Sequence, residues 1–207
     1  MEKKFLDLLS KDNYKIIKKP KEIINGPKKY VINYKIYINQ YKNLFKKFGF
    51  KGNDIILDFG CGPAFSVFVG RNIFNLNVSG LDILPGSGSQ DFIYGDIHDV
   101  LNIKDFVSFY DGNTINNYPD NSFSVILCFW SLLFDYSCQY GKGNYIYPNN
   151  EIGTKLLKKK LTNLVKISKP NCKWIICPPK FWNQDINNLF KEINNKNITV
   201  KLEKLIC

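Results

Sequence analysis

Short apolar runs alternate with helical segments along most of this chain. In the first run, residues 54–58, the apolar residues are consecutive and do not alternate with polar ones. This is typical of a parallel strand covered on both faces. Further strands are expected at residues 77–82, 91–96, 122–128, 173–177 and 198–206, and helices at about 150–168 and 183–194. This alternation predicts an α/β fold with a doubly wound, mostly parallel sheet flanked by helices.

The N-terminal part has a different pattern. Residues 28–47 place apolar side chains at every third or fourth position, which predicts an amphipathic helix that opens near Pro27 and ends at Gly49. Residues 1–24 mix lysines with apolar side chains and predict a short amphipathic helix or a basic arm. We therefore expect a basic helical region over residues 1–48 and an α/β domain over residues 49–207.

Charge is spread unevenly over the 207 residues, whose formal net charge is +11. Residues 1–51 hold 14 lysines and 4 acids, and residues 151–207 hold 12 lysines and 4 acids. Residues 52–150 hold 3 basic and 10 acidic residues. An AT-rich codon usage explains why the cations are almost all lysine but does not explain this segregation. The lysine-rich flanks favour contact with RNA phosphates.

Other features narrow the class of protein. A hydrophobic fraction of 44% is too high for a disordered chain. The sequence shows neither a run long enough to span a membrane nor a secretion signal, so we expect an intracellular, cytoplasmic protein without a membrane partner, a nuclear location also being open. Its six cysteines have no Cys-x-x-Cys pair and it has a single histidine, so we expect no metal site.

A turn of small residues follows the first strand. Gly60 and Gly62 allow the backbone to approach a ligand closely, and a helix is expected to begin directly after them. Phe65 stands where a dinucleotide-binding fingerprint would have its third glycine. Asp58, two residues before the turn, would repel a pyrophosphate and suits a cationic ligand instead.

Two more acids are expected at the ends of the neighbouring strands. Asp82 ends the second strand, where a carboxylate can accept both hydroxyls of a ribose, and Asp96 ends the third. Three acids around a glycine turn predict a site for a positively charged nucleoside. S-adenosylmethionine, with its sulfonium and ammonium groups, fits this description and gives the acidic middle of the chain a function.

Five segments in this order resemble the class I S-adenosylmethionine-dependent methyltransferases over about residues 50–180. They are residues 57–62 (Leu-Asp-Phe-Gly-Cys-Gly), 81–82 (Leu-Asp), 94–97 (Tyr-Gly-Asp-Ile), 119–128 (Pro-Asp-Asn-Ser-Phe-Ser-Val-Ile-Leu-Cys) and 167–171 (Ile-Ser-Lys-Pro-Asn). The resemblance implies a methyltransferase with a Rossmann-like domain over residues 49–207 that lacks the last strand of the family's sheet. A partner protein could then cover the C-terminal sheet edge.

The resemblance also implies roles for single residues. The turn formed by Gly60, Cys61 and Gly62 would approach the methionine part of the cofactor, and Asp58 would face its ammonium group. The remaining contacts would come from Asp82 at the ribose, from Asp96 and Ile97 at the adenine, and from Phe129 and Trp130 at the methyl acceptor. Ile83 would be a further cofactor-binding residue. The two aromatic residues could equally belong to the apolar core. His98 is expected in a loop.

A partial resemblance concerns the FtsJ-like RNA ribose 2′-O-methyltransferases. Only eight residues separate Asp82 from Asp91, fewer than a crossover with a helix needs, and that family has a similarly short connection. Its Lys–Asp–Lys–Glu tetrad has no full counterpart here, because Cys128 and Cys177 stand near the positions of the Asp and the second Lys. We therefore assign no catalytic residue.

Three functions stay open at this point. The chain could be a methyltransferase that acts on RNA, which the basic flanks slightly favour. It could be a methyltransferase for a small molecule, because the segment 119–128 is more common in such enzymes. It could also be a catalytically silent methyltransferase fold that binds nucleic acid or a protein partner.

Overall fold

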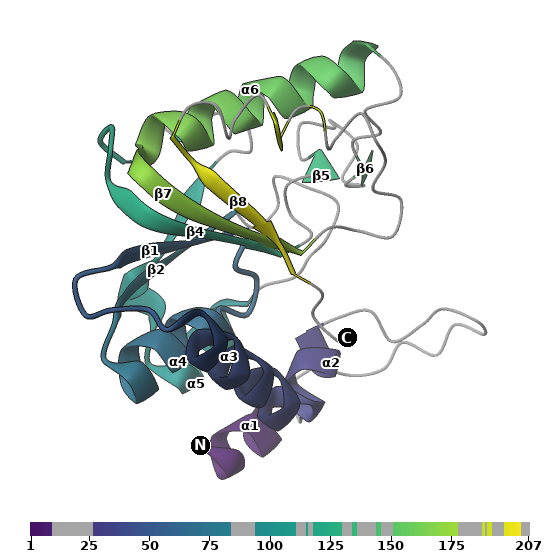
Figure 1. Cartoon of the computed structure of the whole chain (residues 1–207). Coiled ribbons are helices and arrows are strands. Elements are labelled where there is room, and N and C mark those ends of the chain that lie inside the picture. Colours follow the sequence, from purple (N-terminus) through teal and green to yellow (C-terminus); the bar gives the residue numbers. More distant parts are fainter. Residues whose placement is uncertain are drawn as a thin grey trace.

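The strands of the described residues form one six-stranded sheet and one small pair. The computed structural model describes residues 1–9, 27–83, 94–110, 115, 118–129, 134–135, 144–145, 151–177, 188, 190–191 and 197–203. The large sheet has the order β3-β2-β1-β4-β7-β8 (Figure 1). Its strands are β1 (Ile55–Phe59), β2 (Asn77–Ile83), β3 (Val107–Tyr110), β4 (Phe123–Phe129), β7 (Ser168–Cys177) and β8 (Thr199–Leu202). The small antiparallel pair consists of β5 (Phe134–Asp135) and β6 (Asn144–Tyr145).

Each pairing in the large sheet is parallel, from β3 at one edge of the described sheet to β8 at the other. The predicted doubly wound parallel sheet is therefore confirmed. The strand order changes direction between β1 and β4, which pair at Ile56↔Val125 through Asp58↔Leu127. In open α/β sheets, ligands bind beyond the carboxyl ends of the strands at such a switch point. This is where the glycine turn follows β1.

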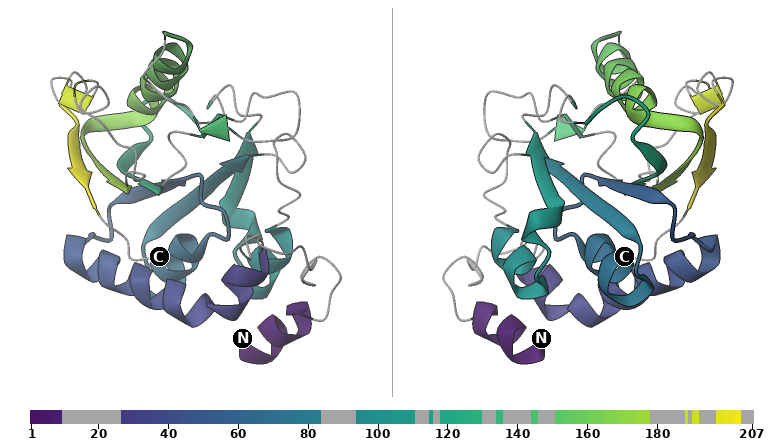
Figure 2. Two further views of the ribbon diagram at one scale, coloured as in Figure 1. Left: turned by 90° about the vertical axis from the view of Figure 1, so that its right-hand side faces the viewer. Right: turned by 90° about the vertical axis from the view of Figure 1, so that its left-hand side faces the viewer.

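Helices cover both faces of the sheet, and the views in Figures 1 and 2 agree on their arrangement. On one face lie α1 (Glu2–Leu9), α2 (Pro27–Ile32), α3 (Tyr34–Phe48), α4 (Phe65–Phe74) and α5 (Gly95–Leu101). On the other face lies α6 (Glu151–Ile167). Two apolar clusters separate accordingly, one under α1–α5 and one under α6, because alternate side chains of each strand point to opposite faces.

The helix predicted over residues 28–47 forms as two pieces, α2 and α3, that meet at Asn33. It ends at Gly49, whose φ of 57° gives the left-handed C-terminal cap that glycine adopts without strain. The N-terminal helices join the core of the sheet, because Phe5 of α1 and Phe45 of α3 are each 1% exposed within the α1–α5 cluster. The domain division at residues 48 and 49 stays a prediction.

The third strand was predicted in the wrong place. Residues 84–93 lie outside the described part, and Tyr94 already precedes α5, where its carbonyl accepts hydrogen bonds from the N–H groups of Ile97 and His98 (2.9 and 3.0 Å). The carboxylate of Asp96 in the first helical turn favours this helix start because it lies at the positive end of the helix dipole. The third strand is instead β3, which follows the short 3-10 helix η2 (Lys104–Phe106) and pairs with Gly80–Ile83 of β2.

This correction has a consequence for the connection between β2 and β3. It contains α5 and η2, so the expectation that its helix is missing was wrong. The short connection on which the partial FtsJ-like resemblance depended does not exist in this fold. Asp96 lies in the first turn of α5 and not at the end of a strand.

The predicted helix at about 150–168 is confirmed as α6, and the predicted last strand forms as β8. The helix predicted over residues 183–194 lies almost entirely outside the described residues. Among the helices of the described part, none has the length and the apolar character that spanning a membrane requires.

Candidate functional site

The turn after β1 has a backbone that few residue types adopt. The φ angles of Gly60, Gly62 and Ala64 are 71°, 50° and 56°. Left-handed backbone costs an alanine roughly 1 kcal/mol and a glycine almost nothing. The turn is held by hydrogen bonds from the Gly60 N–H to the Leu81 carbonyl (2.7 Å) and from the Ala64 N–H to the Cys61 carbonyl (2.9 Å). It leads directly into α4.

Two predicted carboxylates lie on neighbouring strands beside this turn. Asp58 of β1 pairs with Gly80 of β2, so Asp82 stands one step beyond the pairing partner of Phe59. Asp58 shares a strand face with Ile56, and Asp82 shares one with Val78, and both of these apolar residues belong to the α1–α5 cluster. Both carboxylates therefore face the same side of the sheet. Asp58 is 1% exposed and Asp82 is 7% exposed.

Burial changes the acidity of Asp58. It raises the pKa of the carboxyl to about 7, the hydrogen bond from the Ser66 hydroxyl opposes this rise, and the negative charge of Asp82 adds to it. Near neutral pH the carboxyl of Asp58 is thus balanced between its neutral and its ionised form. A positive charge placed beside it would favour the ionised form. The site is electrostatically suited to a cation.

Cys61 fills the space between the turn and β2. Its thiol is buried, and a Cβ atom added to Gly80 would lie only 2.7 Å from its Sγ atom, so glycine at position 80 makes room for this side chain. Burial and the charges of Asp82 and Asp58 raise the pKa of the Cys61 thiol well above its ordinary value. Cys61 is therefore a packed thiol and not a thiolate.

Helix α5 reaches the turn from the side. The Nε2 atom of His98 lies 2.8 Å from the carbonyl oxygen of Gly62, and the Tyr94 ring lies 3.6 Å from where a Cβ on Gly62 would be. Asp96, in the first turn of α5, is half-buried, and Ile97 is fully buried in the α1–α5 cluster. The segment predicted at the adenine thus lies beside the turn, although on a helix.

The predicted acceptor residues are only partly described. Phe129 ends β4, is 8% exposed, and contacts Tyr41 of α3 edge to face with ring centroids 5.7 Å apart. Trp130 lies outside the described residues, as does the side chain of Ile83, whose backbone ends β2. The structure therefore brings together Asp58, Cys61, Asp82 and the turn, with α5 at its side.

Two residues of this site were not predicted from the sequence. Ser66, in the first turn of α4, donates a hydrogen bond to the Asp58 carboxylate, and nothing in its spacing indicates that contact. His98 was expected in a loop, but it lies in α5 and is 1% exposed. The sequence indicated this position only in that the single histidine of the chain lies two residues after Gly95-Asp96.

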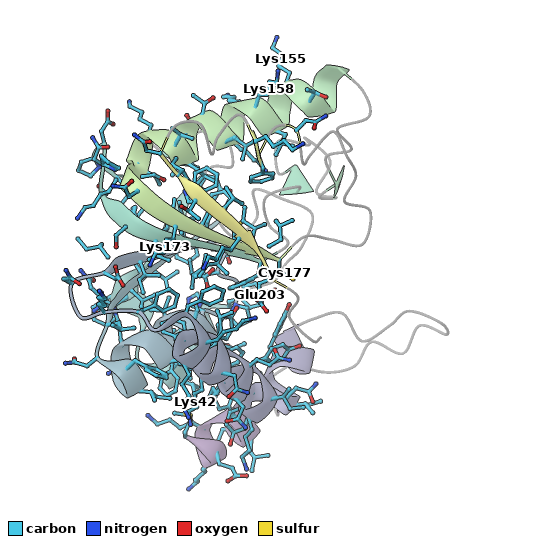
Figure 3. All side chains as sticks on the ribbon, viewed as in Figure 1. Lys42, Lys155, Lys158, Lys173, Cys177 and Glu203 are labelled. Atoms are coloured by element: carbon cyan, nitrogen blue, oxygen red, sulfur yellow. The ribbon has the colours of Figure 1, made fainter. Side chains whose placement is uncertain are left out.

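Among the described residues, the lysines of α6 and those of α3 lie far from one another, whereas Lys201 after α6 lies beside α3, over the Phe48 ring. Lys155 and Lys158 lie on α6 and Lys42 lies on α3, on opposite faces of the sheet (Figure 3). Part of the charge of α3 is also neutralised within the chain, because Lys47 pairs with Glu203 (Nζ–Oε2 2.7 Å) and Lys35 with Glu2 (Nζ–Oε1 2.8 Å). A nucleic acid could contact the lysines of α6 or those of α3, but to contact both it would have to wrap around the sheet.

Comparison with known proteins gives likenesses in structure only. No family model and no curated protein matches the sequence. Among solved structures, the chain resembles a geranyl diphosphate C-methyltransferase from Streptomyces coelicolor A3(2) (15% identity, TM-score 0.46, 88% of this chain and 64% of that one). It also resembles a putative sarcosine dimethylglycine methyltransferase from Galdieria sulphuraria (15%, 0.46, 86% and 56%) and the [4+2]-cyclase SpnF (17%, 0.42, 65% and 42%).

The chain thus spans 42% to 64% of the length of these three structures. Identities and overlaps of this size carry no functional argument, so function has to be argued from the residues of this chain. Those residues define an α/β domain with a doubly wound parallel sheet, and at its switch point a left-handed glycine turn flanked by two buried carboxylates.

Proposed function

We propose that this chain binds S-adenosylmethionine at the glycine turn and transfers its methyl group to an acceptor. One observation carries the proposal: Asp58 and Asp82, both buried, face the same side of the sheet next to the left-handed turn of Gly60 and Gly62. A site built this way suits a ligand that brings a positive charge and ribose hydroxyls. Its chemistry does not suit a pyrophosphate.

The residues fit this cofactor in complementary ways. The glycine turn lets the backbone approach the methionine part, Asp58 faces the ammonium group, and Asp82 accepts the ribose hydroxyls. We place Asp96, which is half-buried in the first turn of α5, at the adenine, whereas Ile97 beside it is fully buried in the α1–α5 cluster. When bound, S-adenosylmethionine supplies an electrophilic methyl group on a sulfonium. The chain then has to position the acceptor atom in line with that methyl group.

Calorimetric titration with S-adenosylmethionine tests the proposal. The wild-type chain should bind, and Asp82→Ala should weaken binding by about 100-fold, because a carboxylate that accepts two hydroxyls contributes roughly 3 kcal/mol. Asp120→Ala is the matched control. This exposed acid precedes β4 at the amino ends of the strands, away from the glycine turn, and pairs with Lys166. Absence of binding to the wild-type chain would refute the proposed function, and equal affinity of Asp82→Ala would refute the ribose assignment.

For the acceptor we propose RNA, held by one of the lysine-rich faces. The supporting observation is the segregation of charge, with exposed lysines such as Lys155, Lys158 and Lys159 on one side of α6. Retention on RNA should fall with rising salt, and the double charge reversal Lys155→Glu/Lys158→Glu should reduce it about tenfold or more. The matched variant Lys42→Glu/Lys46→Glu reports on the face of α3. Retention that does not depend on salt would contradict the proposal.

A small-molecule acceptor is the second candidate. The contact of Phe129 with Tyr41 is the observation in its favour, because it places aromatic rings at the carboxyl end of β4, close to the strand end that carries the glycine turn. Phe129 also belongs to the apolar cluster under α1–α5. Binding of S-adenosylmethionine without retention on RNA would favour this acceptor class. A chain that binds RNA or a protein partner but not S-adenosylmethionine would instead be a silent methyltransferase fold.

A further inference from the structure

The single histidine of the chain is buried against the glycine turn. His98 is 1% exposed, and its Nε2 atom lies 2.8 Å from the carbonyl oxygen of Gly62. A carbonyl oxygen only accepts hydrogen bonds, so Nε2 carries the proton and donates it. Burial lowers the pKa of His98, which keeps the ring neutral at pH 7. The imidazole therefore acts here as a fixed hydrogen-bond donor.

The bonded carbonyl belongs to the part of the backbone that needs the most support. Gly60, Gly62 and Ala64 all have positive φ angles, and glycines in a turn have many other conformations to choose from. The bonds from Gly60 to Leu81 and from Ala64 to Cys61 hold the two ends of the turn. His98 holds the middle of the turn. It lies on α5, whereas the turn itself continues into α4.

We infer that His98 is a positioning residue that holds the glycine turn in its ligand-binding conformation and couples the turn to α5. The inference rests on the proposed function, because the same helix carries Asp96, the residue proposed at the adenine. Through the bond of His98 to Gly62, the part of the site for the methionine and the part for the adenine are fixed relative to each other. His98 itself touches neither the methyl group nor the acceptor.

Three variants separate this role from a general contribution to stability. His98→Leu removes the donor and keeps the apolar packing, whereas His98→Gln returns an N–H donor of similar reach. Leu101→Ala is the matched control, because Leu101 is a buried residue of the same helix (2% exposed) that packs in the α1–α5 cluster. All measurements are made on the full chain, well below the unfolding temperature of each variant.

The first measurement needs no ligand. The Ala64 amide, which donates to the Cys61 carbonyl within the turn, should exchange its hydrogen about tenfold faster in His98→Leu than in Leu101→Ala. His98→Gln should restore most of the protection. Equal exchange in His98→Leu and Leu101→Ala, or no restoration by glutamine, would overturn the positioning role.

The second measurement is the affinity for S-adenosylhomocysteine by calorimetry. His98→Leu should bind about tenfold more weakly than the wild type, and Leu101→Ala should bind like the wild type. An unchanged affinity of His98→Leu would overturn the coupling to the site. If the wild type bound neither this ligand nor S-adenosylmethionine, the proposed function would fail, while the exchange measurement would still decide whether His98 holds the turn.

Discussion

The two faces of the sheet are built from the same strands and yet differ in chemistry. Towards α1–α5 the carboxyl ends of β1 and β2 present Asp58, Cys61 and Asp82, and α5 adds His98. Towards α6 the same strands present Leu57, Phe59 and Leu81, which pack with Trp174 and the leucines of α6. One face combines packing with polar chemistry, and the other is an apolar core.

This difference follows from the alternation of side chains along a strand. A carboxylate at position 58 and a leucine at position 57 are neighbours in sequence but belong to different environments. Changes on the α6 face should therefore affect stability and leave ligand binding intact. Changes on the α1–α5 face near the turn should affect binding.

The largest effect on stability is expected at Trp174, a fully buried residue of the α6 face whose Nε1–H donates to the Ser168 hydroxyl (2.9 Å). Trp174→Ala should lower the free energy of unfolding by about 3–5 kcal/mol because it leaves a large cavity. Trp174→Phe, which keeps most of the volume, should cost less and guards against a variant that does not fold. Urea unfolding measures the loss. A tenfold change in the affinity of folded Trp174→Phe for S-adenosylmethionine would contradict the separation of the two faces.

On the opposite face, Asp58 should make stability depend on pH. Its pKa is about 7 in the folded chain and about 3.8 ordinarily, so between these values the folded state holds a proton that the unfolded state releases. Stability should therefore fall as the pH rises from about 4 to about 7, by up to about 1.4 kcal/mol per pH unit, and this contribution should stay constant above that range.

Asp58→Asn removes this titration, so its stability should depend less steeply on pH than that of the wild type between pH 5 and pH 7. Unfolding in urea at both pH values measures the difference. In the same range, the wild type should bind S-adenosylmethionine more tightly as the pH rises, because the ionised carboxylate favours the ammonium group. Parallel stability curves for Asp58→Asn and the wild type would show that Asp58 keeps an ordinary pKa.

A smaller effect is expected at Gly80, where the two neighbouring strands and the turn meet. Gly80→Ala places its Cβ 2.7 Å from the Cys61 Sγ atom and 3.2 Å from Val67, and this overpacking should cost about 1–3 kcal/mol. Adding Cys61→Ala should recover part of the loss, because the nearest atom is then absent. A double variant as unstable as the single one would contradict the packing of Cys61 against β2.

Much of the fold could be predicted because the apolar runs are strong local patterns. The runs of β1, β2 and β4 and the helix α6 were found where they were predicted. The predicted strand over residues 173–177 forms as part of β7, which begins earlier, at Ser168. The glycine turn was recognisable because backbone with positive φ favours small residues. Asp58 was recognisable because it lies two residues before Gly60, the first glycine of the turn. These are features of consecutive residues.

The errors concern features that depend on distant parts of the chain. The apolar run Phe92-Ile93-Tyr94 before Asp96 looks like a strand, but α5 begins directly after Tyr94. The actual β3 has only four residues, too few for a distinct pattern. The bonds of His98 to Gly62 and of Ser66 to Asp58 arise only when α5 and α4 pack beside the turn. The separation of the lysines of α6 from those of α3 likewise follows from the layers of the fold and not from the order of the residues.

The central claim is that the α1–α5 side of the switch point holds a cationic nucleoside. A crystal structure of the chain with S-adenosylmethionine tests it most directly. We expect the ribose hydroxyls within hydrogen-bond distance of the Asp82 carboxylate and the amino group beside Asp58, with the ligand against Gly60 and Gly62. A ligand bound away from the glycine turn, or no bound ligand at saturating concentration, would contradict the claim.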